Sequence, residues 1–386
     1  MPLVKISQRG RDRIVQGHLW IYRSDVRESD SPESGDVVDV QDPRGTFLGR
    51  AFYSTSSQIT LRLITTEDEV VDESFWRARL VQALARRSQL PPATSAYRWI
   101  HGEADGIPSL IVDRYGDYLS IQTLTAGTDR LKECFLRLWL ELTEATGIME
   151  RNDQKARALE GLPLNKAVLF GEVPAAIPVR EAGIELRVDL REGQKTGLFL
   201  DQRENRVAAG GYAAGKALDV FCYDGGFALH LASACESVLA VDTSTEALSR
   251  LRVNASVNEF QNIEPLQANG FDVLRELEIR GEHFDTIVLD PPAFAKNRSA
   301  VAAARRGYKD INLRAMRLLR PGGLLVTSTC SYHVSEVDFL NILTAAAADA
   351  RSRMILAEKR PQSRDHPILL AMPETHYLKC VILRKL

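Results

Sequence analysis

The chain has 386 residues, 45% of them apolar, and its 49 Lys and Arg nearly balance 51 Asp and Glu at a formal net charge of −2. At roughly 100–200 residues per domain, this length predicts two or three domains with hydrophobic cores and excludes disordered and fibrous proteins. The balanced charge excludes a general attraction to nucleic acid or to membranes, so any site for a polyanion must be a local patch.

Cysteine usage and the N-terminus indicate the compartment. The five cysteines are scattered, odd in number and without a Cys-x-x-Cys pair, which argues against a disulfide framework and against a zinc cluster. The N-terminus lacks the apolar core of a signal peptide, and no stretch approaches the roughly 18 apolar residues of a membrane span. We therefore expect a cytoplasmic protein with no metal and no membrane partner.

Residues 1–68 are predicted to form a small all-β barrel, because short apolar runs near 35–40, 47–53 and 58–64 alternate with turns at hairpin spacing. A basic arm precedes these strands. Its cations are Lys5, Arg9, Arg11, Arg13 and Arg23. Such an arm is typical of a nucleic-acid contact, and a solvated charged face explains it about equally well.

Residues 69–190 are predicted to form a small central α+β domain without a chemical motif of its own. Its expected elements are helices at 73–90 and 128–146 and strands near 97–101, 109–113, 117–124, 166–170 and 183–190. In the second helix, apolar residues recur at three- and four-residue spacing and include Cys134, which we expect in the core.

Residues 191–386 alternate between strand and helix patterns, which predicts a mostly parallel sheet with helices on both faces. The expected strands are 217–221, 238–241, 286–289 and 324–327, with helices at 226–235, 244–258 and 301–320. A closing pair at 353–359 and 377–384 lacks a long helix between its strands, so an antiparallel final hairpin is expected. The overall prediction is an α/β chain.

The first of these strands runs into a glycine turn, Asp219 to Gly226, at the start of a helix, where doubly wound sheets bind ligands. The turn lacks the Gly-x-Gly-x-x-Gly spacing that seats the pyrophosphate of a nicotinamide cofactor. Asp242 ends the next strand and can accept hydrogen bonds from ribose hydroxyls. A nucleoside without pyrophosphate fits both facts, and S-adenosylmethionine is the cofactor we predict. Adjacent glycines also occur in ordinary turns.

Two further strand ends carry reactive groups. Asp290-Pro291-Pro292 follows the fourth strand, and Cys330 follows the fifth, so the acid and the thiol should be neighbours at the crevice mouth. Taken alone, the Asp290-Pro291-Pro292 segment would be interpreted as a rigid turn, and Cys330 would be interpreted as a packing residue. Among the other cysteines, only Cys222, in the cofactor loop, competes as the reactive thiol.

This pair of groups suits methylation of a pyrimidine at C5. That carbon is a weak nucleophile until a thiolate, here Cys330, adds to C6. Asp290 would hold the N3 and N4 edge of a cytosine and assist protonation as charge develops on the ring. The base that removes the C5 proton is not identified by the sequence.

A second basic patch follows the Asp290 loop and could contact RNA phosphates or form a solvated helix face. Its members are Arg298, Arg305, Arg306, Lys309, Arg314, Arg317 and Arg320.

Several motifs together resemble the bacterial 23S rRNA cytosine-C5 methyltransferases with an N-terminal PUA domain, over nearly the full chain. These motifs are Gly17-His18-Leu19-Trp20-Ile21-Tyr22, Ser57-Gln58-Ile59, Gly102 to Pro108, Val112-Asp113-Arg114-Tyr115, Gly193 to Arg203, Val241-Asp242-Thr243-Ser244, Gly307 to Asn312 and Asp365-His366-Pro367.

The resemblance implies a PUA barrel at 1–68, a central α+β domain at 69–190 and a Rossmann-like methyltransferase domain of seven strands at 191–386. It implies S-adenosylmethionine as cofactor, 23S rRNA as substrate and Cys330 as the single catalytic cysteine, since Ala293 stands where related enzymes carry a second one. The implied cofactor contacts are Lys195, Thr196, Asp201, Gln202, Arg203, Asp219, Phe221, Cys222, Tyr223, Gly225, Asp242, Asn269, Gly270 and Asp290. The RNA contacts that we expect are Lys5, Arg9, Arg11, Arg13, Arg305, Arg306 and Lys309.

Two residues depart from the family pattern and bear on cofactor affinity: Asp224 replaces a usual Thr, and Asn269 replaces an acid that accepts the adenine amino group.

Two alternative functions stay open. One is a nucleic-acid methyltransferase of exocyclic amines, which would not need Cys330, and the other is an inactive RNA-binding ribosome-assembly factor. The sequence does not determine which cytosine is the target or whether the substrate is naked rRNA or an assembly particle. It also leaves open whether the protein forms a homodimer.

Overall fold

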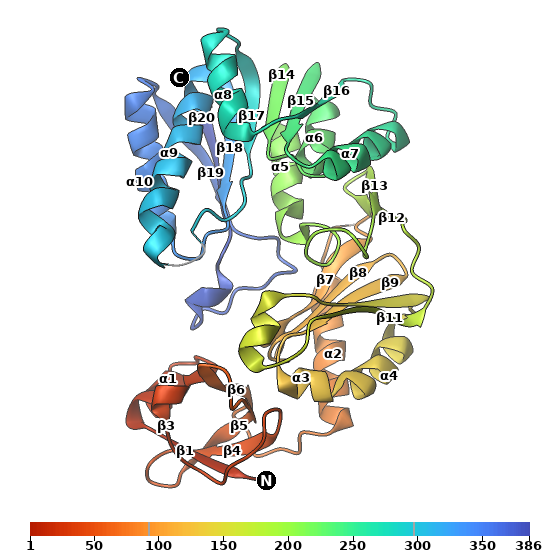
Figure 1. Cartoon of the computed structure of the whole chain (residues 1–386), viewed down its shortest axis with the longest axis vertical. Coiled ribbons are helices and arrows are strands. Elements are labelled where there is room, and N and C mark those ends of the chain that lie inside the picture. Colours follow the sequence, from red (N-terminus) through yellow and green to blue (C-terminus); the bar gives the residue numbers. More distant parts are fainter. Residues whose placement is uncertain (92, 296–297) are drawn as a thin grey trace. The chain divides into compact units, whose positions relative to one another are not determined.

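A computed structural model describes residues 1–91, 93–295 and 298–386 and divides them into two compact units. The first unit comprises 1–179, 188–200 and 364–375, and the second comprises 180–187, 201–363 and 376–386. Figure 1 labels the elements of both. In the described residues no helix is long and apolar enough to cross a membrane. The division into domains at 68/69 and 190/191 stays a prediction.

The N-terminal part of the first unit is a six-stranded sheet in the order β2-β6-β5-β4-β1-β3. Its strands are β1 (Leu3–Ile6), β2 (Trp20–Tyr22), β3 (Val26–Ser29), β4 (Val37–Gln41), β5 (Phe47–Tyr53) and β6 (Ile59–Thr65). The expected basic arm is instead built into this domain as β1 and helix α1 (Gln8–Val15). Ser7 starts the helix by accepting a hydrogen bond from the Gly10 amide, and Ile14 joins the barrel core.

A second sheet of the first unit has the order β11-β10-β9-β8-β7. Its strands are β7 (Ala96–His101), β8 (Leu110–Tyr115), β9 (Tyr118–Thr123), β10 (Gly147–Asn152) and β11 (Asn165–Gly171), and its helices are α2 (Glu73–Arg87), α3 (Ala126–Arg130) and α4 (Lys132–Thr143). Trp76, Trp99 and Trp139 fill the core between them. Strand β10 was not expected, and Cys134 lies half-buried at the margin of this core. A short hairpin, β12 (Ile177–Glu181) and β13 (Ile184–Val188), follows.

The second unit is built on a seven-stranded sheet in the order β16-β15-β14-β17-β18-β20-β19. Its strands are β14 (Lys216–Val220), β15 (Ser237–Asp242), β16 (Ile263–Gln267), β17 (Phe284–Leu289), β18 (Leu319–Thr329), β19 (Met354–Arg360) and β20 (Lys379–Lys385). Strands β14 to β18 are parallel, whereas β20 is antiparallel to both β18 and β19, as expected for the final hairpin. The predicted α/β class is confirmed.

Helices cover this sheet because its strands are apolar toward both faces. They are α5 (Arg203–Tyr212), α6 (Gly226–Ala232), α7 (Thr245–Val257), α8 (Gly270–Ile279), α9 (Val301–Leu318) and α10 (Glu336–Asp349). Helices α8, α9 and α10 share one core with β17 and β18, in which Tyr308 and Phe339 are fully buried. The loops after the parallel strands therefore gather at one edge of a rigid sheet.

Candidate active site

Strand register brings the predicted reactive residues to one edge of the seven-stranded sheet. Val220 at the end of β14 is level with Leu289 of β17, and Leu289 is level with Thr327 of β18. Asp290 and Cys330 therefore follow neighbouring strand ends, beside the loop that follows β14. The predicted proximity of these segments is confirmed.

The loop between β14 and α6 has an unusual backbone. Phe221 and Tyr223 have positive φ angles of 69° and 51°, and Gly225 has a φ of 90°. A Cβ atom at Gly225 would lie 2.0 Å from a methyl carbon of Leu251, so only glycine fits there. The amides of Phe221 and Cys222 both donate to the carbonyl of Val241. These contacts tie the loop to the neighbouring strand.

Asp242 holds the same loop from the end of β15. One carboxylate oxygen accepts the Tyr223 amide and the other accepts the Ser244 amide, each at 2.9 Å. Because each oxygen has a second lone pair, this half-buried carboxylate keeps the capacity to accept hydroxyl groups. It can therefore orient the loop and bind a ribose at the same time.

Asp219 is a fully buried acid at the base of the loop. In the part of the chain that the structure describes, neither of its carboxylate oxygens has a hydrogen-bond partner. Burial raises its pKa well above the usual value, and the charges of Asp290 and Asp242 raise it further, while the nearby Ala228 amide lowers it. A cationic amino group would supply the missing donors and charge, so the site fits the methionine end of S-adenosylmethionine.

The start of α8 forms another wall of this region. Asn269 caps the helix by accepting the Phe271 amide at 2.9 Å, and the second lone pair of this oxygen keeps the capacity to accept an adenine amino group. A Cβ atom at Gly270 would lie 2.7 Å from Val220 and 2.8 Å from Phe221. Glycine is therefore required for the close approach of α8 to the cofactor loop.

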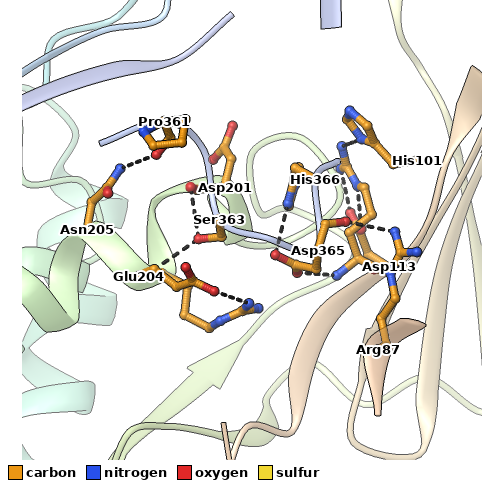
Figure 2. Close-up of polar contacts among 12 residues, drawn as sticks. Arg87, His101, Asp113, Asp201, Glu204, Asn205, Pro361, Ser363, Asp365 and His366 are labelled. Atoms are coloured by element: carbon orange, nitrogen blue, oxygen red, sulfur yellow. Dashed lines mark hydrogen bonds and ion pairs between the residues drawn. The ribbon is translucent and has the colours of Figure 1, made fainter. Parts of the chain in front are cut away.

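Residues 201–203 support the Asp290 side of the site. The Gln202 amide donates to the Asp290 carboxylate at 2.7 Å and in turn accepts from Asn205 at 2.7 Å. Tyr377 donates to Asp201 at 2.9 Å, and Arg203 is buried. Figure 2 shows Ser363 donating to the Asp201 carbonyl, at 3.0 Å. Gln202 thus orients the carboxylate that is predicted to hold the base.

Lys195 and Thr196, also expected to bind cofactor, lie in the first unit. The buried Thr196 hydroxyl donates to Asp113 and lies 3.4 Å from the Tyr115 hydroxyl, while the Lys195 ammonium lies 4.4 Å from the centre of the Phe199 ring. Their cofactor role stays a prediction.

Cys330 is half-buried directly after β18, whereas Cys222, Cys235 and Cys380 are buried. Burial raises the pKa of Cys222 well above the usual value, that of Cys235 to about 11 and that of Cys380 to about 12. Burial and the nearby Glu73 also raise the pKa of the half-buried Cys134. These four thiols are held in their protonated, unreactive form.

The backbone beside Cys330 is clamped by residues that the sequence did not single out. The Ser331 hydroxyl accepts the Ala295 amide at 3.2 Å and lies 2.9 Å from the Tyr308 hydroxyl. The Lys379 ammonium donates to the Ser331 carbonyl at 3.3 Å. A lysine inside the apolar run 378–383 was the sequence signal for this buried cation.

Ion pairs engage most of the predicted RNA-binding residues. The ion pairs of the two basic patches are Lys5 with Glu28, Arg9 and Arg13 with Asp25, Arg11 with Asp12 and Asp42, Arg305 with Asp338, Lys309 with Asp349, Arg314 with Asp310 and Glu278, Arg317 with Glu278, and Arg320 with Asp285. Arg306 is exposed on α9. These pairs reduce the net positive charge of both patches, and their RNA contact stays a prediction.

Comparison with known proteins agrees with this geometry. Residues 4–66 match the family model of a PUA-like domain, and residues 165–368 match that of an S-adenosylmethionine-dependent methyltransferase. The chain is 39% identical over 393 residues to ribosomal RNA large subunit methyltransferase I of Yersinia pseudotuberculosis, and 98% of each is covered. The chain belongs to this methyltransferase family. The predicted cofactor, S-adenosylmethionine, is confirmed.

Solved structures show the same fold. The crystal structure of the methyltransferase SMU.776 complexed with SAH has a TM-score of 0.86 at 19% identity, and all of both chains is covered. A SAM-dependent methyltransferase from Streptococcus mutans has a TM-score of 0.84 at 19% identity, also over all of both chains. The predicted arrangement of a PUA-like barrel before a Rossmann-like methyltransferase sheet is confirmed.

Proposed function

We propose that this enzyme forms 5-methylcytosine in 23S rRNA, with Cys330 as the nucleophile. The observation that carries the proposal is the position of this half-buried thiol, one strand away from Asp290 and beside the cofactor loop. The named relative is a large-subunit rRNA methyltransferase, which supports the substrate class.

Each reacting group has a role in this proposal. The bound S-adenosylmethionine supplies an electrophilic methyl group. The Cys330 thiolate adds to C6 of the cytosine, which makes C5 electron-rich enough to be methylated. Asp290, oriented by Gln202, holds the N3 and N4 edge of the ring. Asp219, Asp242 and the loop that ends at Gly225 bind the cofactor.

The PUA-like barrel and the basic residues of α1 and α9 complete the proposal as RNA contacts. An ion pair on a protein surface contributes only about 0–1 kcal/mol, so phosphates can compete with the acids that now pair with Arg305 and Lys309. Binding through these contacts should weaken steeply with salt.

The test is methyl transfer from labelled S-adenosylmethionine to unmodified 23S rRNA, followed by nucleoside mass spectrometry. We expect 5-methylcytidine with the wild type, none with Cys330→Ser, and wild-type amounts with Cys134→Ser, which alters the other half-buried thiol.

Other outcomes point to other functions. A Cys330→Ser enzyme with near wild-type activity would exclude the thiolate mechanism and favour methylation of an exocyclic amine, for which Asp290 and its two prolines suffice. A wild type that binds rRNA without forming product would support an assembly factor.

A further inference from the structure

Strand β20 carries a buried cation next to Cys330. Lys379 is only 5% exposed, and it is level with Thr329, the last residue of β18 and the residue before Cys330. Its ammonium group donates to the carbonyl of Ser331 at 3.3 Å and to that of Tyr377 at 3.2 Å. Lys379 therefore touches the backbone on both sides of the reactive cysteine.

The partners of this ammonium group leave its charge uncompensated. Both are neutral carbonyl oxygens, and within the described residues no carboxylate lies at ion-pair distance from it. A buried cation without a counter-ion is costly, and a thiolate would provide the missing negative charge. Burial lowers the pKa of Lys379, while a charge on Cys330 raises it, so each group favours the charged form of the other.

Three other ionisable groups of the described residues lie on the elements around Cys330 and Lys379, and none of the three is a cation. Tyr308, from α9, has a pKa raised mainly by burial and further by a charge on Cys330. Glu336, at the start of α10, raises the pKa of Lys379 but is paired with the exposed Lys359 at 2.5 Å. Asp290, directly after β17, is an acid whose carboxylate accepts from Gln202. Among these groups Lys379 alone carries a positive charge toward the thiol.

We propose that Lys379 is a positioning residue that keeps Cys330 as a thiolate and fixes the backbone that carries it. This inference deepens the proposed function and rests on it. The Cys330 thiol loses its proton to solvent, and the ammonium group of Lys379 stabilises the resulting anion. The sulfur electron pair then forms the bond to C6, and the electron pair of the C5–C6 double bond moves to C5. After C5 has taken up the methyl group, which leaves the cofactor as a neutral thioether, a base removes the C5 proton and the electron pair of that C–H bond re-forms the C5–C6 double bond. The electron pair of the C6–S bond returns to sulfur, and Lys379 again stabilises the thiolate.

The thiol itself can be tested without RNA or cofactor. The rate of alkylation by iodoacetamide is followed from pH 5 to 10 in the full chain, with the Cys330 peptide quantified by mass spectrometry. Lys379→Gln removes the positive charge but keeps two amide N–H donors for the carbonyls. Lys379→Met removes the charge and the donors. We expect the midpoint of the pH profile to rise by about one unit or more in either variant, and Lys379→Arg to keep the wild-type midpoint.

Strand β20 also offers a matched control. Lys385 donates to the carbonyls of Met316 and Leu319, each at 2.7 Å, and burial lowers its pKa as well. Lys385→Met thus removes the same charge and a similar pair of hydrogen bonds at the other end of the strand. We expect it to leave the Cys330 profile unchanged. A shift of equal size in this control, or no shift in Lys379→Gln, would overturn the proposal.

Methyl transfer separates this inference from the proposed function. We expect Lys379→Gln to slow methylation at pH 7 and to recover as the pH rises. If Cys330→Ser remains active, the proposed function is wrong, while the alkylation profile still decides whether Lys379 controls the thiol.

Discussion

Asp224 is a buried acid in the loop between β14 and α6. It is 5% exposed, and burial raises its pKa to about 6, although Arg206 and Arg250 act to lower it. Since the folded pKa lies above the ordinary value of 3.8, folding favours the protonated form. Its contribution to stability is full below about pH 4 and is lost as the pH rises through 6.

Replacing Asp224 by Asn should remove this pH dependence. A difference of about two pKa units corresponds to about 3 kcal/mol. The unfolding free energy of Asp224→Asn, measured relative to that of the wild type, should therefore increase by about this amount between pH 4 and pH 8. Urea unfolding at several pH values measures it, with the exposed Asp272→Asn as control. An equal difference at every pH would show that Asp224 does not titrate in this range.

The connection from β14 to α6 is the element that shapes the proposed cofactor site. Its residues with positive φ angles turn the chain away from the sheet within a few residues, and Gly225 then starts the helix. Gly-rich turns at this position leave backbone groups open to a ligand. We therefore propose that the conformation of the loop is part of cofactor binding.

Gly225→Ala should disturb this element. The new methyl group would clash with Leu251 at a backbone angle unsuited to alanine, which should cost about 1–3 kcal/mol of stability and weaken S-adenosylmethionine binding. Thermal unfolding and calorimetric titration of the cofactor measure the two effects. Gly211→Ala is the control, because nothing lies within 4 Å of a Cβ atom at this exposed position in α5. Unchanged cofactor affinity in Gly225→Ala would contradict the role of the loop.

At the scale of the whole molecule, the chain passes between its two compact units more than once, and residues 361–366 form one such passage. Figure 2 shows the hydrogen bonds that this segment makes in each of the two units. Ser363 accepts the Glu204 amide at 3.0 Å, within the second unit. Asp365 accepts the Arg98 amide at 2.8 Å and its carbonyl accepts from Arg87 at 2.8 Å, within the first unit. The passage is therefore anchored within each unit.

Asp365→Ala should loosen the first-unit side of this passage. Arg87 would keep its bonds to Asp105, but the Arg98 amide would lose a buried acceptor, at a cost of about 1–3 kcal/mol. We expect faster hydrogen exchange in residues 364–375, measured by mass spectrometry, with unchanged protection of β18 as the internal control. Equal exchange of 364–375 in both proteins would mean that Asp365 does not anchor the segment.

Much of the fold follows from local patterns in the sequence. Short apolar runs predicted the strands of the seven-stranded sheet except β16, and the missing helix between 359 and 377 predicted the antiparallel final pair. The same patterns placed Asp290 and Cys330 at neighbouring strand ends, because parallel strands end at one edge. Strand β10 was missed, since the preceding helix pattern ran up to it, and the arm before the barrel became β1 and α1.

What the sequence by itself determined was therefore the order of most elements, the edge of the sheet at which the predicted reactive residues lie and the residues that follow each strand. Only the tertiary structure decided which charges meet. It pairs Arg9 with Asp25, which lowers the net charge of a predicted RNA patch, and it brings Lys379 against the Ser331 carbonyl, next to Cys330. Periodicity records which face of an element is buried, whereas contacts between side chains far apart in the chain depend on packing and on the cost of burying a charge.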